Sequence, residues 1–182
     1  MNFIKLIFFF FVMISLSYGM NNDADSTRNK LPISIKFGYK SPTDNSFHST
    51  VAGFCFSIST DIELSEKYLI QPSFLLWNSK YKYITPYNEN VTLTTVAAFL
   101  KYQIDLEEII LLPKIGVGFS KASDTGKQLL SALYGVEINY IYESSITMQF
   151  EILNHLSAVP DVGGTSQSFA PVLISLGFQF FL

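Results

Sequence analysis

Apolar and polar residues alternate along the chain in about eight separate segments, and this alternation limits the fold more than any other feature. The clearest segment reads SITMQFEIL, in which Ile146, Met148 and Phe150 share one face while Thr147 and Gln149 share the other. Because successive side chains of a β-strand point to opposite faces, a period of two indicates strands with one apolar face. No heptad or helical pattern competes with it. The sequence therefore predicts an all-β chain.

The expected strands have the length of membrane-crossing strands, for which about 9–11 tilted residues suffice. They cover residues 32–40, 50–60, 67–78, 91–103, 109–120, 130–142, 145–155 and 171–182. Short connections (DIELSEK, DLEE, YES) alternate with longer ones (SPTDNSFHST, SKYKYITPYNEN, KASDTGKQL, LSAVPDVGGTSQSFA). Outer-membrane barrels show this alternation, with short periplasmic turns and longer outer loops.

The polar face of these segments is too weakly polar for a surface in water. It carries small residues such as Gly38, Ser57, Ser73 and Gly116, which suit the interior of a narrow barrel. The last segment, SLGFQFFL, stays apolar to its final residue, and hydrocarbon accepts such a strand if the sheet closes. We therefore expect an eight-stranded antiparallel up-and-down transmembrane β-barrel. The alternative is a secreted soluble barrel with its apolar face inward.

Aromatic residues near the strand ends fit the girdle that such barrels place at each membrane interface. They are Tyr39, Tyr68, Trp77, Tyr102, Tyr140 and Tyr142, although the alternation puts Trp77 on the inner face.

The N-terminal residues have the pattern of an export signal. Lys5 precedes an apolar run over residues 6–18, and small residues follow at Ser17 and Gly19. The run is shorter than the roughly 20 residues of a membrane-spanning helix. We expect residues 1–19 to be a signal peptide, residues 20–31 a polar tail and residues 32–182 the barrel, exported to the bacterial outer membrane.

Composition excludes several other kinds of function. The formal net charge of −3 gives no support to nucleic-acid binding, which needs a basic patch. Cys55 is the one cysteine, so an intramolecular disulfide or a cysteine zinc cluster is ruled out. We expect no metal site and no cofactor.

The final segment also resembles the C-terminal β-signal of bacterial outer-membrane proteins. Ser175, Gly177, Phe180 and Leu182 occupy its positions, with Leu182 in place of the usual terminal phenylalanine. YLIQPSFLLW and TVAAFLKYQI are similar to strands of small outer-membrane β-barrel domain proteins common in Bacteroidetes. This resemblance implies contact with outer-membrane lipid and lipopolysaccharide, and assembly by the barrel-assembly machinery through the C-terminal strand. It implies no particular surface ligand.

Five charged residues fall on the inner face of the expected strands: Lys36, Lys101, Lys114, Glu137 and Glu151. A charge inside a membrane protein is costly unless it is paired, and it then marks a functional candidate. Two interpretations stay open. The residues form a structural ion network that fills the lumen, or they line a conducting path.

The segment NHLSA resembles the His-x-Ser motif of lipid A 3-O-deacylases, which are also eight-stranded barrels. The resemblance implies that His155 is a general base and Ser157 a nucleophile, with Asp161 as the nearest later acid. Ala158 stands where that family has asparagine. Those enzymes act from the lipid-facing wall, whereas the alternation places His155 inside unless a β-bulge intervenes.

The expected function is therefore non-catalytic: a structural or surface-interaction barrel with a polar lumen filled by side chains. SKYKYITPYNEN, rich in tyrosine and lysine, is the first candidate for a contact loop, because loops on rigid scaffolds often carry recognition. The alternatives are the deacylase-like esterase and a small pore or conduit for hydrophobic solutes.

Overall fold

The structure is a computed structural model, and it describes residues 31–42, 50–80, 90–123, 128–143, 146–159 and 167–181. The expected signal peptide, most of the polar tail, the expected contact loop from residue 81 and Leu182 lie outside these ranges. No helix long and apolar enough to cross a membrane occurs among the described residues.

The strands lie within a few residues of the predicted ranges, because period-two alternation is a direct record of strand geometry. They are β1 (Pro32–Lys40), β2 (Gly53–Thr60), β3 (Ile62–Glu63), β4 (Tyr68–Lys80), β5 (Asn90–Tyr102), β6 (Ile104–Leu106), β7 (Ile109–Ala122), β8 (Gln128–Glu143), β9 (Ile146–Val159), β10 (Gln167–Phe169) and β11 (Val172–Phe181).

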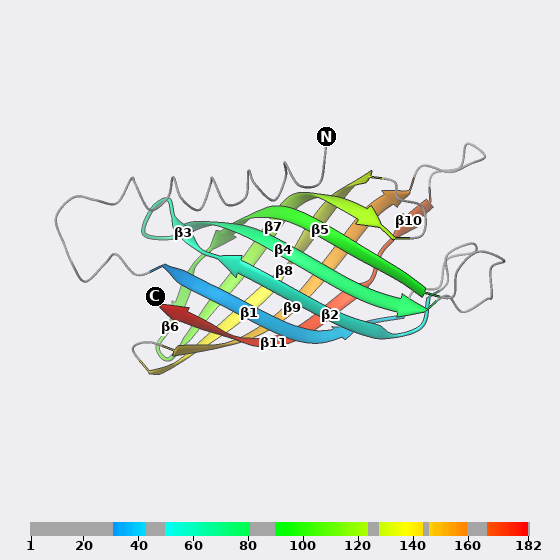
Figure 1. Cartoon of the computed structure of the whole chain (residues 1–182). Coiled ribbons are helices and arrows are strands. Elements are labelled where there is room, and N and C mark those ends of the chain that lie inside the picture. The colour runs from blue at the N-terminus through cyan, green and yellow to red at the C-terminus, as the bar shows by residue number, and fades with distance from the viewer. Residues whose placement is uncertain are drawn as a thin grey trace.

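The sheet closes on itself. The hydrogen-bonded order runs β1, β2, β4, β5, β7, β8, β9, β11 and back to β1, with every pair antiparallel. β3, β6 and β10 continue β2, β5 and β11 across short breaks. Figure 1 shows β1 and β11 side by side where the barrel closes. The predicted eight-stranded antiparallel barrel is confirmed.

The strands are staggered around the barrel. Ser34 pairs with Gln179 across the closing seam. Cross-strand partners can also be followed from Ser34 the other way around the barrel, through β2, β4, β5, β7 and β8. This path reaches Ser157 on β9 and then its partner Phe169 on β10. Phe169 precedes Gln179, the partner of Ser34 across the seam, by ten residues, so the path around the barrel does not return to its starting level. Such a stagger requires tilted strands, by roughly 35–45° in barrels of this kind.

The apolar face of the strands points outward. Side chains exposed by about half or more include Phe37, Phe54, Ile115, Val117, Phe119, Leu130 and Leu176. The tyrosines expected in the girdles are also exposed, whereas Trp77 is fully buried inside and does not belong to a girdle. The apolar wall is the surface that a lipid-facing barrel requires.

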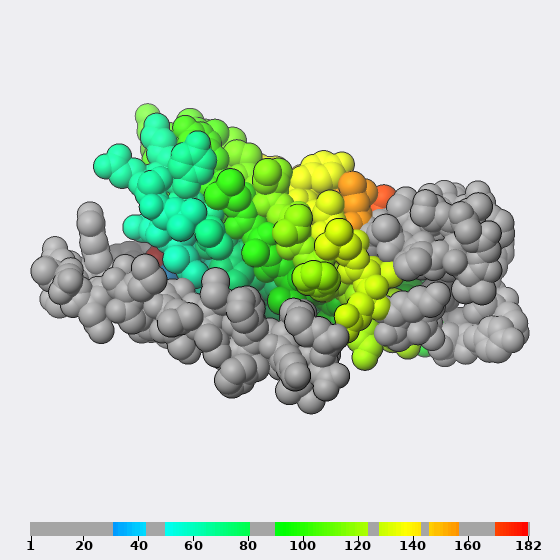
Figure 2. Space-filling model, turned by 90° about the horizontal axis from the view of Figure 1, so that it is seen from above, coloured from blue at the N-terminus to red at the C-terminus, as the bar shows by residue number. Residues whose placement is uncertain are grey.

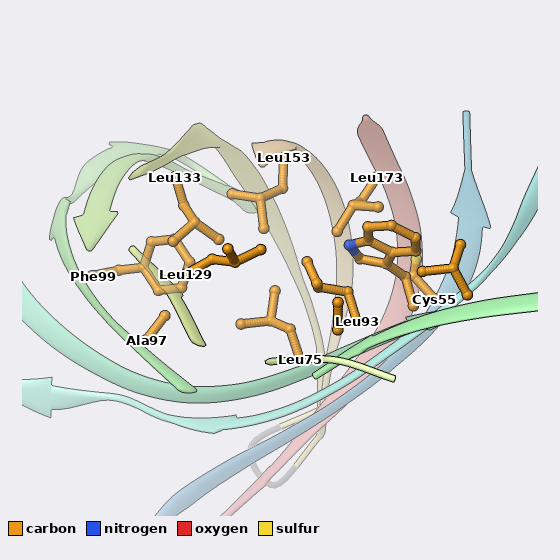
Figure 3. Close-up of a cluster of buried hydrophobic side chains, with 12 residues drawn as sticks. Cys55, Leu75, Leu93, Ala97, Phe99, Leu129, Leu133, Leu153 and Leu173 are labelled. Atoms are coloured by element: carbon orange, nitrogen blue, oxygen red, sulfur yellow. The ribbon is translucent and has the colours of Figure 1, made fainter. Parts of the chain in front are cut away.

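The interior is not polar throughout, and this corrects the sequence prediction. A buried apolar cluster includes Trp77, Leu93, Phe99 and Leu153. Figure 3 shows Leu133, Leu153 and Leu173 pointing toward Leu75 and Leu93 across the interior. An eight-stranded barrel is just wide enough for side chains to fill. Most of the buried apolar side chains lie in the half of the interior near the β4–β5 and β9–β10 connections, and most of the buried charged side chains lie in the other half.

Two glycines on the closing seam allow β1 and β11 to approach closely. A Cβ atom on Gly177 would lie 2.2 Å from the carbonyl oxygen of Ile35, and one on Gly38 would lie 1.9 Å from that of Ile174. Both contacts are shorter than real Cβ atoms show. The seam therefore requires glycine at these positions.

Candidate functional site

Six charged side chains meet in the polar half of the interior and form what we call the interior ion cluster. Its members are Lys36, Lys101, Lys114, Asp61, Glu137 and Glu151. The five residues singled out from the sequence all belong to it. Asp61 was missed, because it lies in the break between β2 and β3, where alternation gives no direction. Three lysines balance three carboxylates, so the cluster carries no formal net charge.

Glu137 lies at the centre of the interior ion cluster. Its carboxylate accepts hydrogen bonds from Lys101 Nζ at 2.8 Å, from Lys36 Nζ, and from Lys114 Nζ at 3.4 Å. Glu151 lies directly opposite on β9. Two carboxylates in such a cross-strand pair repel each other. Lys36 and Lys114 each bind both carboxylates, which removes that repulsion.

Further hydrogen bonds extend the cluster to two more strands, β4 and β11. Lys101 Nζ donates to Asp61 at 3.0 Å, and Gln179 Nε2 donates to the other Asp61 oxygen at 2.9 Å. Lys114 Nζ donates to Gln71 Oε1 at 3.2 Å, and Gln149 Nε2 donates to Glu137 at 3.2 Å. These bonds satisfy charges that are buried almost completely, which is the condition for keeping ions inside a protein.

A second polar network, centred on His155, lies within the apolar half. Trp77 Nε1 donates a hydrogen bond to His155 Nδ1 at 3.1 Å. Since Nδ1 accepts, the ring proton belongs on Nε2, which faces Ser120 Oγ at 3.3 Å and Thr95 Oγ1 at 3.5 Å. Ser120 continues the network to Ser131. The ring is therefore held in one tautomer by partners from three other strands, β4, β5 and β7.

The enzyme hypothesis requires His155 to face lipid, and the structure does not meet that requirement. The ring is fully buried inside the barrel. Ser157 lies in β9, opposite Ser131 and Phe169, but the structure does not describe its side chain. Asp161 lies outside the described residues. The hydroxyl groups that face the ring are those of Ser120 and Thr95, and they are buried with it in the interior.

We expect the removal of the His155 ring to be visible in fluorescence. Trp77 is the one tryptophan of the chain, so emission reports on it alone. In His155→Leu, Trp77 loses its acceptor, and unfolding free energy should fall by about 1–3 kcal/mol. Emission of the folded barrel should shift to shorter wavelength, because a polar partner is replaced by an apolar side chain. Tyr39→Leu, an exposed change, should leave the emission maximum in place. An unchanged spectrum in His155→Leu would contradict the hydrogen bond.

Lys40 is a buried cation that the sequence did not single out. Its ammonium donates to Thr50 Oγ1 and to the carbonyl oxygen of Val51 at 3.1 Å, with Ser79 Oγ at 3.5 Å. The ring of Trp77 lies 5.2 Å away, within the range of a cation–π contact. Lys40 thus ties the end of β1 to the residues just before β2 and to the end of β4.

The other residues that the sequence singled out lie in the barrel wall or outside the residues that the structure describes. Ser175 and Gly177 face the interior and Phe180 faces outward. Within the described ranges, no group of three or more His, Cys, Asp or Glu side chains is placed to hold a metal ion. The cysteine Cys55 is free and buried.

The closed ring, outward apolar wall and filled interior define the class of fold: an eight-stranded β-barrel of the outer-membrane type. Solved structures of this class match the chain. Neisserial surface protein A matches with a TM-score of 0.56 at 11% identity, covering 84% of this chain and 96% of its own. Ail, the attachment invasion locus protein of Yersinia pestis, gives 0.56 at 14%, covering 84% and 98%. A major outer membrane protein from Thermus thermophilus gives 0.50 at 9%, covering 84% and 98%.

No protein-family model matches the sequence, and no curated protein matches it. At these identities the similarity is one of fold.

Proposed function

We propose that the protein is a non-catalytic barrel of a bacterial outer membrane, with a structural or surface-interaction role carried by the longer connections between its strands. The observation that supports this most is the distribution of side chains across the wall. Large apolar residues are exposed on the outside, while paired ions are buried inside. In water this arrangement would leave a continuous apolar surface uncovered. In a bilayer it satisfies both faces.

The structural neighbours support the same conclusion. They are outer-membrane proteins, and the name of Ail refers to attachment and invasion. We propose that export uses residues 1–19 as a signal peptide, and that assembly uses the C-terminal strand through Ser175, Gly177, Phe180 and Leu182. Lipid and lipopolysaccharide are the proposed surroundings, and the surface ligand is unknown.

The first test is insertion. The purified chain should fold into phospholipid vesicles and migrate as a compact band on unheated gels that shifts on boiling. Its strands should be protected from added protease. A chain that stays soluble and digestible in the presence of vesicles, or that folds equally well without lipid or detergent, would contradict the membrane proposal.

The interior leads to a separate expectation about transport. The ion cluster and the apolar cluster fill successive levels of the barrel, so we expect no stable channel in planar bilayers with the folded protein. Opening a path should require removal of bulk from both levels, as in Trp77→Ala combined with Lys114→Ala. Stable conductance of the unaltered barrel would favour the small-pore alternative instead.

A further inference from the structure

Three buried polar atoms beside the interior ion cluster have no hydrogen-bond partner among the residues that the structure describes. They are Ser34 Oγ, Gln71 Nε2 and Gln149 Oε1, and each of these residues is at most 2% exposed. Burying such an atom without a partner destabilises a protein, because water satisfies the same atom in the unfolded chain. The three atoms therefore indicate positions where something other than the chain supplies a hydrogen bond.

The ion cluster itself fixes the direction of both amides. Gln71 Oε1 accepts a hydrogen bond from Lys114, so turning this amide over would set its NH₂ group against an ammonium. Gln149 Nε2 donates to Glu137, so turning that amide over would set its oxygen against a carboxylate. The free donor of Gln71 and the free acceptor of Gln149 thus follow from the positions of the charges.

Water fits the three atoms better than an ion does. One atom is a donor and one is an acceptor, while the hydroxyl of Ser34, two residues before Lys36 on the inner face of β1, serves as either. A water molecule donates and accepts, whereas a cation satisfies only acceptors and an anion only donors. The three lysines and three carboxylates already balance, so no net charge attracts an ion. Buried water in proteins commonly bridges polar groups of this kind.

An apolar layer closes the interior on the side of the longer connections. Figure 3 shows Leu133, Leu153 and Leu173 pointing toward Leu75 across the interior. The wall is closed as well, because its strands are hydrogen-bonded all the way around. Figure 2 shows the side chains of β4, β5, β7 and β8 packed side by side over this wall. The other end of the barrel is therefore the route by which water reaches the cluster.

That end, the one with the short connections, is largely polar. Asn139, Thr147 and Gln179 lie there, and each is 5–6% exposed, whereas Glu137 at the centre of the cluster is not exposed at all. Two buried apolar side chains also lie at this end, on β4 and β7: Leu69 and Leu112. A polar route to the cluster therefore runs along β8, β9 and β11.

We propose that the polar half of the interior is a vestibule for water, open toward the periplasm and closed toward the outside, in which Ser34, Gln71 and Gln149 each bind a water molecule. The proposal rests on the membrane orientation proposed above. The vestibule gives water and protons access to the interior ion cluster from one side only. The apolar layer separates this water from the outer medium, which agrees with a barrel that does not conduct.

Hydrogen exchange of two side chains tests the vestibule in the full chain folded in detergent micelles. NMR follows the Gln71 amide protons and the Trp77 indole proton after transfer to D₂O, and Gln71→Met identifies the amide signal. The protection factor is the exchange rate in the denaturant-unfolded chain divided by the rate in the folded chain. Trp77 lies in the apolar half, where its Nε1 donates to His155. We expect its protection factor to exceed that of Gln71 by about tenfold or more, because local access to water lowers protection without global unfolding.

Two variants act as controls. Asn139→Leu places an apolar side chain in the polar route, so it should raise the protection of Gln71 and leave that of Trp77 unchanged. Leu129→Ser adds a hydroxyl to the apolar cluster and should leave the protection of Gln71 unchanged. Thr147→Val makes a smaller change in the same route and replaces Asn139→Leu if that variant does not fold. Equal protection of Gln71 and Trp77 in the unaltered protein, or a route variant that leaves Gln71 unchanged, would overturn the proposal.

The same samples report on the bound water and on the barrel. A dipolar cross-peak between water and the Gln71 amide protons is expected, and its absence would overturn the proposal. A gel shift on boiling is recorded for every sample. Loss of that shift in the unaltered protein would count against the membrane barrel itself, whereas a normal shift with a dry Gln71 counts only against the vestibule.

Discussion

Replacing Glu137 with glutamine is expected to cost about 4 kcal/mol of unfolding free energy, more than any other single charge change in the barrel. Its carboxylate accepts hydrogen bonds from three buried lysines. Removing one partner of a buried ion pair costs about 3–5 kcal/mol, because the remaining charge stays uncompensated. Glu137→Gln leaves the interior with one excess positive charge and exposes Lys36 and Lys101 to mutual repulsion. Urea unfolding in lipid vesicles measures the loss.

A surface carboxylate gives the matched control. Glu66 is exposed in the turn before β4 and makes no ion pair with the described residues, so Glu66→Gln should change the unfolding free energy by less than about 0.5 kcal/mol. A loss below about 1 kcal/mol in Glu137→Gln would show that water or a rearranged lysine compensates the charge. The interior ion cluster would then not hold the barrel together.

Restoring charge balance should recover part of the loss. Glu137→Gln combined with Lys101→Met removes one charge of each sign, and the double variant should be more stable than Glu137→Gln alone. Residues of one ion network are energetically coupled, so the effects of the two changes will not add. A double variant less stable than Glu137→Gln would mean that the lost hydrogen bonds, rather than the charge imbalance, dominate.

The strands were predictable because their signal is local. Alternation in residues 146–152 or 33–39 needs no knowledge of any partner, since the pleat itself sorts side chains to two faces. Small residues on the polar face then showed which face is inside. The alternation alone placed four charged residues on the inner face: Lys36, Lys114, Glu137 and Glu151.

The missed residues depend on information that alternation does not carry. In β4, Phe74 and Leu76 face outward while Leu75 and Trp77 face inward. Both faces of the strand are apolar there, so the contrast from which a polar interior was predicted is absent. Asp61 lies in a break between strands, where the alternation does not indicate which way a side chain points. Which residues meet across the interior depends on the ten-residue stagger, and therefore on the register of every strand pair. The sequence does not fix that register locally.

Adding a single methyl group at Gly177 is expected to prevent stable closure of the barrel. In Gly177→Ala the new Cβ would lie 2.2 Å from the carbonyl oxygen of Ile35 and 2.6 Å from Cγ of Lys36. The carbonyl belongs to the β1–β11 ladder and cannot move away without breaking the seam. Overpacking costs about 1–3 kcal/mol where side chains can adjust, and more where backbone must move. We expect most of the purified variant to remain in the slow, unfolded band when it is mixed with vesicles.

Two comparisons make the cause of that failure visible. Leu176→Ala changes the neighbouring outward residue and should fold, because it removes contacts with lipid and adds none within the seam. Gly38→Ala should fail like Gly177→Ala, because its Cβ would meet the Ile174 carbonyl across the same seam. Folding of purified protein involves no assembly machinery. If Gly177→Ala folds normally in vesicles but is absent from the membrane of cells, the glycine serves recognition of the C-terminal strand, and the steric argument for the seam is wrong.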